Sequence, residues 1–173
     1  MERNPLVRRL ATISLVFIFL VILAGSVVRA TGSGMGCPDW PQCFGYTIPP
    51  TDVETLTWRT GRSFEEGQMI LLKDQFWVAT ADFTTGDAFA PENWTLFDRH
   101  DYNIFNPVHT WIEFINRLIG ALSGLPVLAL AIIGVWGVRR NIWNTVLSVG
   151  VLFLLLFEAW LGKLVVDGNL VPN

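Results

Sequence analysis

The stretch LIGALSGLPVLALAIIGVWGV, from Leu118 to Val138, decides the fold class, because it holds no ionisable side chain between Arg117 and Arg139. A helix rises about 1.5 Å per residue, so about 20 residues cross the roughly 30 Å hydrocarbon core of a bilayer. The stretch is long enough for that. The alternative, a helix buried in a soluble core, would be acceptable for one such window only.

Two further windows have the same character. The first runs from Leu10 to Val28, and the other runs from Asn141 to Gly162, interrupted only by Glu158. The composition agrees, since 51% of the residues are hydrophobic and the mean hydropathy is +0.44. The sequence therefore predicts an all-α membrane protein with three transmembrane helices and one large extracytoplasmic loop.

Basic residues predict the orientation. Arg3, Arg8 and Arg9 precede the first span, and Arg139 and Arg140 lie between the second and third. Positively charged flanks usually stay in the cytoplasm, so we expect a cytoplasmic N-terminus and an outward-facing loop. The plasma (inner) membrane of a bacterium is the predicted location.

The predicted boundaries follow from these spans. They are 1–29 for the cytoplasmic N-terminus and first span, 30–106 for the outer loop, 107–138 for the second span, 139–142 for a cytoplasmic turn, 143–162 for the third span, and 163–173 for an outer tail. Most charged residues of the outer loop are acidic. The chain has no basic patch, so nucleic acid is not expected as a partner.

Local signals predict elements at the loop and its end. The spacing of Ser63 and Glu66 is that of a capping box and predicts a short helix through about Lys73. The run from Phe76 to Ala79 is strand-like. Asn106 followed by proline is typical of a helix start, so we expect the second span to begin there.

Cys37 and Cys43 are the only two cysteines and lie in the outer loop. An oxidising compartment permits a disulfide between them. A metal site is less favoured, because no nearby cysteine or histidine completes it. The spacing does not decide between a structural and a redox-active disulfide.

Polar residues gather at the start of the second span. His109, Glu113 and Asn116 are spaced so that they share one helical face, and Arg117 flanks that face. Polar groups at the edge of a span normally point into a bundle or cavity. Two other interpretations stay open: an interfacial salt bridge between Glu113 and Arg117, and an ordinary hydrogen-bonding role for His109.

Glu158 in the third span has two interpretations as well. It could pair with Lys163, about one turn later, or it could face the same cavity as Glu113. The sequence does not choose between them.

Three segments together resemble the N-terminal part of the heme A synthase family. They are RATGSGMGCPDWPQCFG (Arg29 to Gly45), EFINRLIG (Glu113 to Gly120) and LGKLVVDGNLVP (Leu161 to Pro172). Their order relative to the spans agrees with the family. The middle of the outer loop, from about Thr51 to Phe105, falls outside the resemblance.

The resemblance implies eight transmembrane helices in two related four-helix halves, each with a heme site near the outer side. It implies oxidation of a methyl group of heme O to a formyl group in the N-terminal half, and a heme b in the C-terminal half. On this basis Glu113 is the expected catalytic residue. Cys37 and Cys43 match the cysteine pair of the family's first outer loop.

The sequence departs from the family at two places. Asn116 stands where the motif has a heme-ligating histidine, and an amide is a poor ligand for heme iron. His109, two turns earlier on the same face, is the predicted substitute, as cofactor contact and metal ligand. The chain ends at Asn173, where the family continues into a fourth helix. We therefore expect a truncated chain that is inactive alone.

The leading hypothesis is a membrane oxidoreductase of heme A biosynthesis, with Asn116, Arg117 and His109 as cofactor-binding residues. Expected partners are heme O, membrane lipid, heme O synthase or cytochrome oxidase assembly factors, and a second copy of the chain. One alternative is a non-catalytic heme-binding or oxidase-assembly protein. Another is a thiol–disulfide protein built on the two cysteines, which would lack a second cysteine pair.

Overall fold

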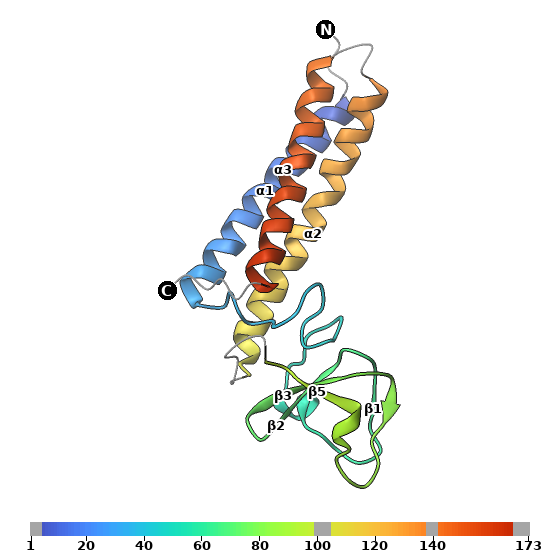
Figure 1. Ribbon diagram of the computed structural model, residues 1–173. Coiled ribbons are helices and arrows are strands. Elements are labelled where there is room, and N and C mark those ends of the chain that lie inside the picture. The colour runs from blue at the N-terminus through green and yellow to red at the C-terminus, as the bar shows by residue number, and fades with distance from the viewer. Residues whose placement is uncertain (1–4, 99–104, 138–141, 168–173) are drawn as a thin grey trace. The chain divides into compact units, whose positions relative to one another are not determined.

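The computed structural model describes residues 5–98, 105–137 and 142–167. Three long helices dominate this part of the chain: α1 (Pro5–Thr31), α2 (Pro107–Trp136) and α3 (Ile142–Asp167) (Figure 1). Each contains an apolar window long enough to cross a membrane, with mean hydropathies of 2.7, 2.4 and 2.0. The predicted fold class, a helical membrane protein with three spanning helices, is confirmed.

The chain divides into two compact units. The helical unit comprises α1 up to Ala30, α2 from Ile115 onward, and α3 up to Leu164. The loop unit comprises the described residues within 31–114, together with 165–167. The first turns of α2 therefore belong to the loop unit.

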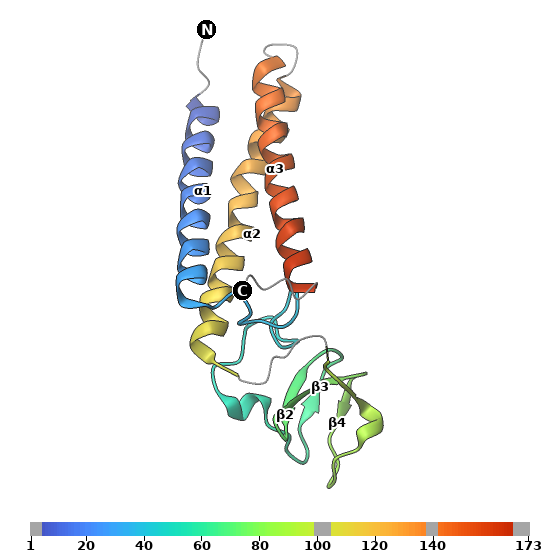
Figure 2. The ribbon, with the colours of Figure 1, turned by 60° about the vertical axis from the view of Figure 1, so that its left-hand side comes forward.

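Small residues bring α2 and α3 of the helical unit close together, and these two helices lie side by side in Figure 1 and Figure 2. A Cβ atom on Gly134 of α2 would collide with the hydroxyl of Ser148 on α3. Thr145 Oγ1 donates a 2.6 Å hydrogen bond to the Gly134 carbonyl. Such close approach at a small residue is common between membrane helices.

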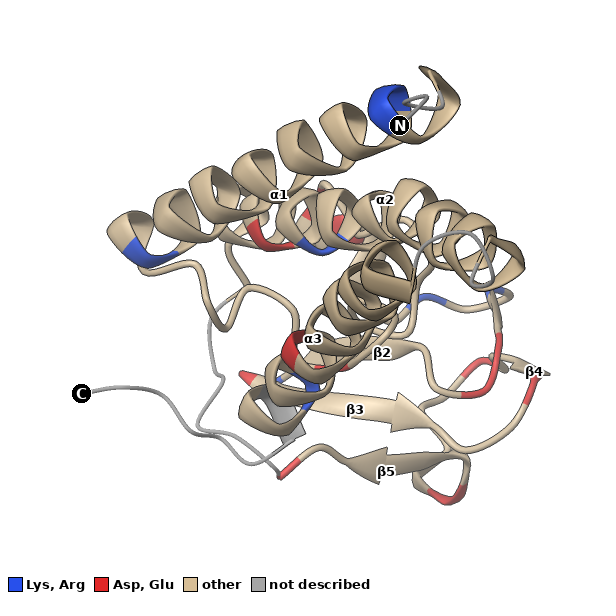
Figure 3. Cartoon of the chain, turned by 90° about the horizontal axis from the view of Figure 1, so that it is seen from above, with Lys and Arg blue, Asp and Glu red and all other residues tan. Residues whose placement is uncertain are grey.

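The outward surface of the helical unit is apolar. No residue in the most apolar window of α3 is buried, and large side chains such as Phe153 and Leu154 are exposed. The charged residues of the helices, blue and red in Figure 3, lie toward the helix ends, and the middle turns are uncharged. In water this surface would be unfavourable, whereas lipid tails solvate it, so the protein is a membrane protein.

The loop unit contains a β structure that the sequence pattern only partly predicted. Strands β1 and β4 form one antiparallel pair, and β2, β3 and β5 form a three-stranded antiparallel sheet. The elements are η1 (Val53–Leu56), β1 (Ser63–Phe64), β2 (Met69–Leu72), β3 (Gln75–Ala79), β4 (Phe83–Thr84), η2 (Pro91–Asn93) and β5 (Trp94–Leu96).

The predicted helix from Ser63 to about Lys73 is wrong. This stretch holds β1 and β2, separated by a turn in which Gly67 has φ 87°. A residue in that conformation cannot continue a right-handed helix. Phe64 is buried against Trp94, with ring centroids 5.1 Å apart. Packing of this side chain therefore outweighs the local capping signal.

The predicted strand from Phe76 to Ala79 is confirmed as part of β3. Its hairpin with β2 closes at the pair Leu72 and Gln75. The two residues between them, Lys73 and Asp74, have φ of 53° and 60°. Two successive positive φ values form the tight turn that suits the twist of an antiparallel hairpin.

Two apolar clusters fill the loop unit. The cluster that matters for the site surrounds the disulfide: Cys37, Cys43, Phe44, Leu56, Met69, Phe76 and Phe105. The other lies among Phe64, Ile70, Ala79 and Trp94. The disulfide is therefore a core element of the loop unit.

Candidate functional site

A disulfide joins Cys37 and Cys43, six positions apart, and closes the segment called here the cysteine loop, residues 37–43. Asp39 organises the end of this loop. Its two carboxylate oxygens accept the backbone N–H groups of Phe44 and Gly45, at 2.6 and 2.7 Å. These two residues have positive φ, so Asp39 supplies charge-assisted bonds to a turn that is otherwise unfavourable for Phe44.

The cysteine loop is attached to the sheet of the loop unit. Cys43 and Tyr46 exchange two backbone hydrogen bonds of 3.0 and 3.1 Å, and Met69 N–H donates to the Phe44 carbonyl at 3.0 Å. A Cβ atom on Gly45 would collide with the Gly67 carbonyl. The loop therefore rests on a structured base.

The start of α2 was predicted correctly. Asn106 Oδ1 accepts the backbone N–H groups of Val108 and His109, at 3.0 and 3.3 Å. Pro107 occupies the first helical position, where a missing N–H costs nothing. The cap fixes the residue at which α2 begins. It therefore also determines which residues lie in the first turns of the helix.

The first turns of α2 hold one peptide group between two side chains. The Thr110 hydroxyl donates to the carbonyl of Gly36 at 2.9 Å. The N–H of Cys37 donates to Glu113 Oε2 at 2.8 Å. Thr110 is 0% exposed and Glu113 is 4% exposed. We call this arrangement the peptide clamp: the Gly36–Cys37 peptide held by Thr110 and Glu113.

Only glycine fits at position 36 of this clamp. A Cβ atom there would overlap the carbonyl of His109 and lie 2.9 Å from the N of Thr110. The backbone of α2 and the backbone before the disulfide therefore touch directly. Cys37 Sγ lies 3.7 Å from the Thr110 carbonyl oxygen, a packing contact because a disulfide sulfur carries no proton.

The structure brings Glu113, Cys37 and Cys43 of the predicted site residues together in one buried part of the loop unit. Asn116 belongs to the helical unit, where its Oδ1 lies 3.9 Å from the position a Cβ of Gly25 would take. The salt bridge between Glu113 and Arg117 stays a prediction.

Glu158 lies on α3, where its side chain is exposed. Neither of its two predicted roles is tested by these contacts.

A heme with two axial imidazoles would need two histidines. His109 is the one histidine among the described residues. In the same part of the chain, no group of three or more His, Cys, Asp or Glu side chains could hold a metal ion. The described residues alone do not fit a bis-histidine heme site. His109 as a ligand stays a prediction.

Sequence reasoning missed Thr110 and Asp39. Thr110 precedes Glu113 by three positions on a helix, and that spacing could have marked it as a neighbour on the same face. Asp39 lies inside the short disulfide loop, where an acidic side chain commonly satisfies backbone N–H groups of a turn. Thr110 bonds to a residue far away in the sequence, and Asp39 bonds to an irregular turn. The sequence alone does not reveal either hydrogen bond.

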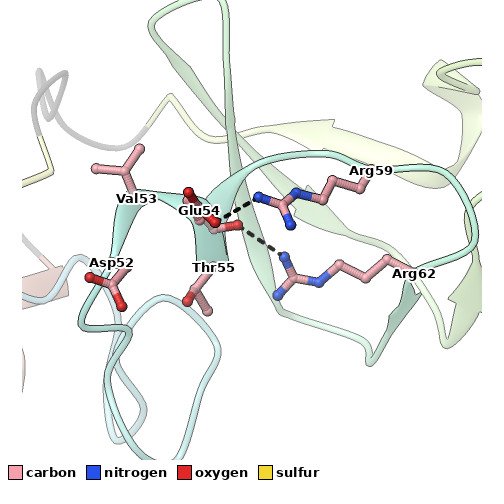
Figure 4. Close-up of a pocket in the computed structure, with 6 residues that line it drawn as sticks. All are labelled: Asp52, Val53, Glu54, Thr55, Arg59 and Arg62. Carbon is pink, nitrogen blue, oxygen red and sulfur yellow. Dashed lines mark hydrogen bonds and ion pairs between the residues drawn. The ribbon is translucent and has the colours of Figure 1, made fainter.

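A surface hollow of about 660 Å³ lies elsewhere in the loop unit, lined by Asp52, Val53, Glu54, Thr55, Arg59 and Arg62. Both arginines point toward Glu54 (Figure 4). Arg59 pairs with the Glu54 carboxylate at 2.8 Å, and Arg62 donates to the Glu54 backbone carbonyl at 3.4 Å. The ion pair is exposed and contributes little. We place no functional site there.

The spanning helices and the clamped disulfide loop define an integral membrane protein of the helical class. The chain belongs to the cytochrome oxidase assembly protein family, whose sequence model matches residues 8–80 and 91–173. The resemblance stated from the motifs is thereby confirmed. It is also wider than predicted: of the middle of the outer loop, only residues 81–90 lie outside the match.

Two curated relatives are both named heme A synthase. The protein from Shewanella oneidensis is 28% identical over 165 residues, which are 94% of this chain and 37% of that protein. The protein from Shouchella clausii is 46% identical over 43 residues, 24% of this chain and 14% of that protein. The chain thus spans little more than a third of the first relative's length. No solved structure matches the chain.

Proposed function

We propose that this chain is part of a membrane oxidoreductase of heme A biosynthesis that oxidises a methyl group of heme O to a formyl group. Family membership and the names of the two relatives support this. The structural observation that carries it is the buried carboxylate of Glu113, held by the Cys37 N–H at the start of a spanning helix. A buried carboxylate without this partner would be costly.

The proposed roles are those that the family resemblance implies for these positions on α2. Glu113 assists proton transfer as the methyl group is oxidised, because a fixed carboxylate can accept a proton from a nearby reacting group. Arg117 pairs with Glu113 or with a heme propionate, and Asn116 contacts the heme. Heme O is the substrate, and a heme b belongs to the remainder of a longer protein.

Analysis of heme products in the full-length protein tests the proposal. Glu113→Gln should abolish conversion of heme O to heme A while heme binding persists, since the amide keeps an acceptor for Cys37 N–H but loses the base. The matched control is Glu92→Gln, an exposed acid of the loop unit that should convert at the wild-type rate. Full activity of the Glu113→Gln variant rejects the catalytic role.

The proposed orientation places the N-terminus and the 139–142 turn in the cytoplasm of a bacterium, and the loop unit outside the plasma membrane. The arginine pattern supports it. An acidic loop with a disulfide suits an oxidising compartment. A phosphatase reporter that folds only outside should be active when fused within 81–90 and inactive when fused at 139–142. The reverse pattern rejects the orientation.

A second candidate function is a non-catalytic heme-binding or oxidase-assembly protein. Asn116 favours it, since the position matches a heme-ligating histidine in the family motif. Heme O synthase, assembly factors or a second copy of the chain would then be the relevant partners. The product assay separates the two functions, because only an oxidoreductase yields heme A.

A further inference from the structure

We propose that Thr110 and the buried disulfide are positioning elements that fix the orientation of the Glu113 carboxylate through the Gly36–Cys37 peptide. The inference deepens the proposed function and rests on it. Thr110 does not touch the substrate in this mechanism. It acts through the backbone to which Glu113 is bound.

The first step of the argument is the geometry of one peptide group. A peptide unit is planar, and in the trans form its C=O and N–H point in opposite directions. Thr110 holds the Gly36 carbonyl and Glu113 holds the Cys37 N–H. By fixing the direction of the carbonyl, the Thr110 hydroxyl also fixes the direction in which the N–H meets Glu113.

The second step concerns what happens when the orientation of the Glu113 carboxylate is no longer fixed. Glu113 has several rotatable bonds, and an unanchored carboxylate would sample several rotamers. The bond from Cys37 N–H removes that freedom before any substrate arrives. Misplacement of a reacting group by about 1 Å can cost about 10²-fold in rate. A weakened clamp should therefore lower the rate of the chemical step.

The third step concerns the disulfide. Cys37 is 0% exposed and Cys43 is 1% exposed, and both pack among Phe44, Met69 and Phe76. Thiol–disulfide exchange requires a thiolate to reach a sulfur, and that access is closed in the folded loop unit. The disulfide therefore holds Cys37, and with it the amide that binds Glu113, and does not exchange with a redox partner.

Activity measurements on the full-length protein give the first test. Thr110→Val removes the hydroxyl at nearly constant volume and should lower kcat for heme O oxidation by about tenfold to a hundredfold, with KM unchanged. Thr110→Ser keeps the hydroxyl and should restore kcat. The control is Thr57→Val, which removes an exposed hydroxyl bound to the Val53 carbonyl at 3.0 Å and should change neither value. If Thr110→Val fails to fold, Thr110→Ala carries the same expectation.

Hydrogen exchange at the Cys37 amide gives a second test that needs no activity. Exchange should accelerate in Thr110→Val and in Glu113→Ala, and stay slow in Thr110→Ser and Glu113→Gln. Unchanged exchange in Thr110→Val overturns the clamp. Accelerated exchange with an unchanged kcat overturns the positioning role alone. If the wild-type protein makes no heme A, the proposed function fails, while the exchange data still decide whether the clamp exists.

Discussion

The backbone N–H of Cys37 donates a 2.8 Å hydrogen bond to Oε2 of Glu113, across 76 positions of sequence. The bond joins the segment that follows α1 to the first turns of α2. Because the donor belongs to a disulfide-bonded residue and the acceptor is buried, the bond is protected from water. Bonds to a charged acceptor in such a setting are worth about 1.5–3 kcal/mol.

Gly36→Ala should destabilise the loop unit, because the added methyl overlaps the His109 carbonyl. Forcing an extra methyl group into a packed site typically costs about 1–3 kcal/mol. Thermal unfolding of the purified protein in detergent should show a lowered Tm. Gly86→Ala is the matched control, since nothing lies within 4 Å of a Cβ at that position. Equal Tm values for the two variants would contradict the close backbone contact.

Asp39→Asn should weaken the turn at Phe44 and Gly45. The amide offers one acceptor where the carboxylate offered two, and its NH₂ group faces a backbone donor. We expect a loss of about 1–3 kcal/mol in the free energy of unfolding, measured by denaturant titration. Asp87→Asn, on an exposed position of the same unit, serves as the control. An equal loss of unfolding free energy in the two variants would contradict the role of Asp39 in stabilising the turn.

The disulfide should resist reduction while the loop unit is folded. Both sulfurs are buried, so a mild reductant followed by an alkylating reagent should leave the mass unchanged under native conditions. The same treatment in denaturant should add two alkyl groups. Loss of the link, in a Cys37→Ser and Cys43→Ser double variant, should cost roughly 2 kcal/mol on the loop-closure estimate. Rapid alkylation of the folded protein would support a redox-active pair.

Stability should fall at high pH through Tyr46. Burial raises the pKa of this phenol above its ordinary value of 10.0, and the nearby Arg62 partly offsets the rise. The folded state then keeps a proton that the unfolded state loses. The contribution of Tyr46 to the free energy of unfolding is therefore complete below about pH 10. It declines as the pH rises from there toward the pKa of the folded state. Unfolding measured from pH 8 to 11 should show a steeper loss in the wild type than in Tyr46→Phe. Parallel curves would exclude this titration.

The membrane-spanning elements were predictable because the signal is one of composition. A window without charge needs no partner elsewhere in the chain to be recognised, and Leu118 to Val138 lies inside α2 apart from its last two residues. The start of that helix was equally predictable, because Asn106 and Pro107 act on neighbouring residues. Local chemistry was enough in both cases.

The loop unit was harder to predict, because its structure depends on contacts between distant residues. The capping signal at Ser63 was overruled by burial of Phe64 against Trp94 and by the turn at Gly67. At the site, Glu113 was recognised by its charge at the edge of a span. The backbone N–H of Cys37 that donates to this carboxylate has no signature in the sequence.

The sheet has a consequence for any attempt to shorten the outer loop. The Met69 N–H bonds to the Phe44 carbonyl, and Met69 and Phe76 pack in the same cluster as both cysteines. The sheet therefore cannot be removed without uncovering the disulfide. A chain shortened in the laboratory needs new apolar cover for Cys37 and Cys43.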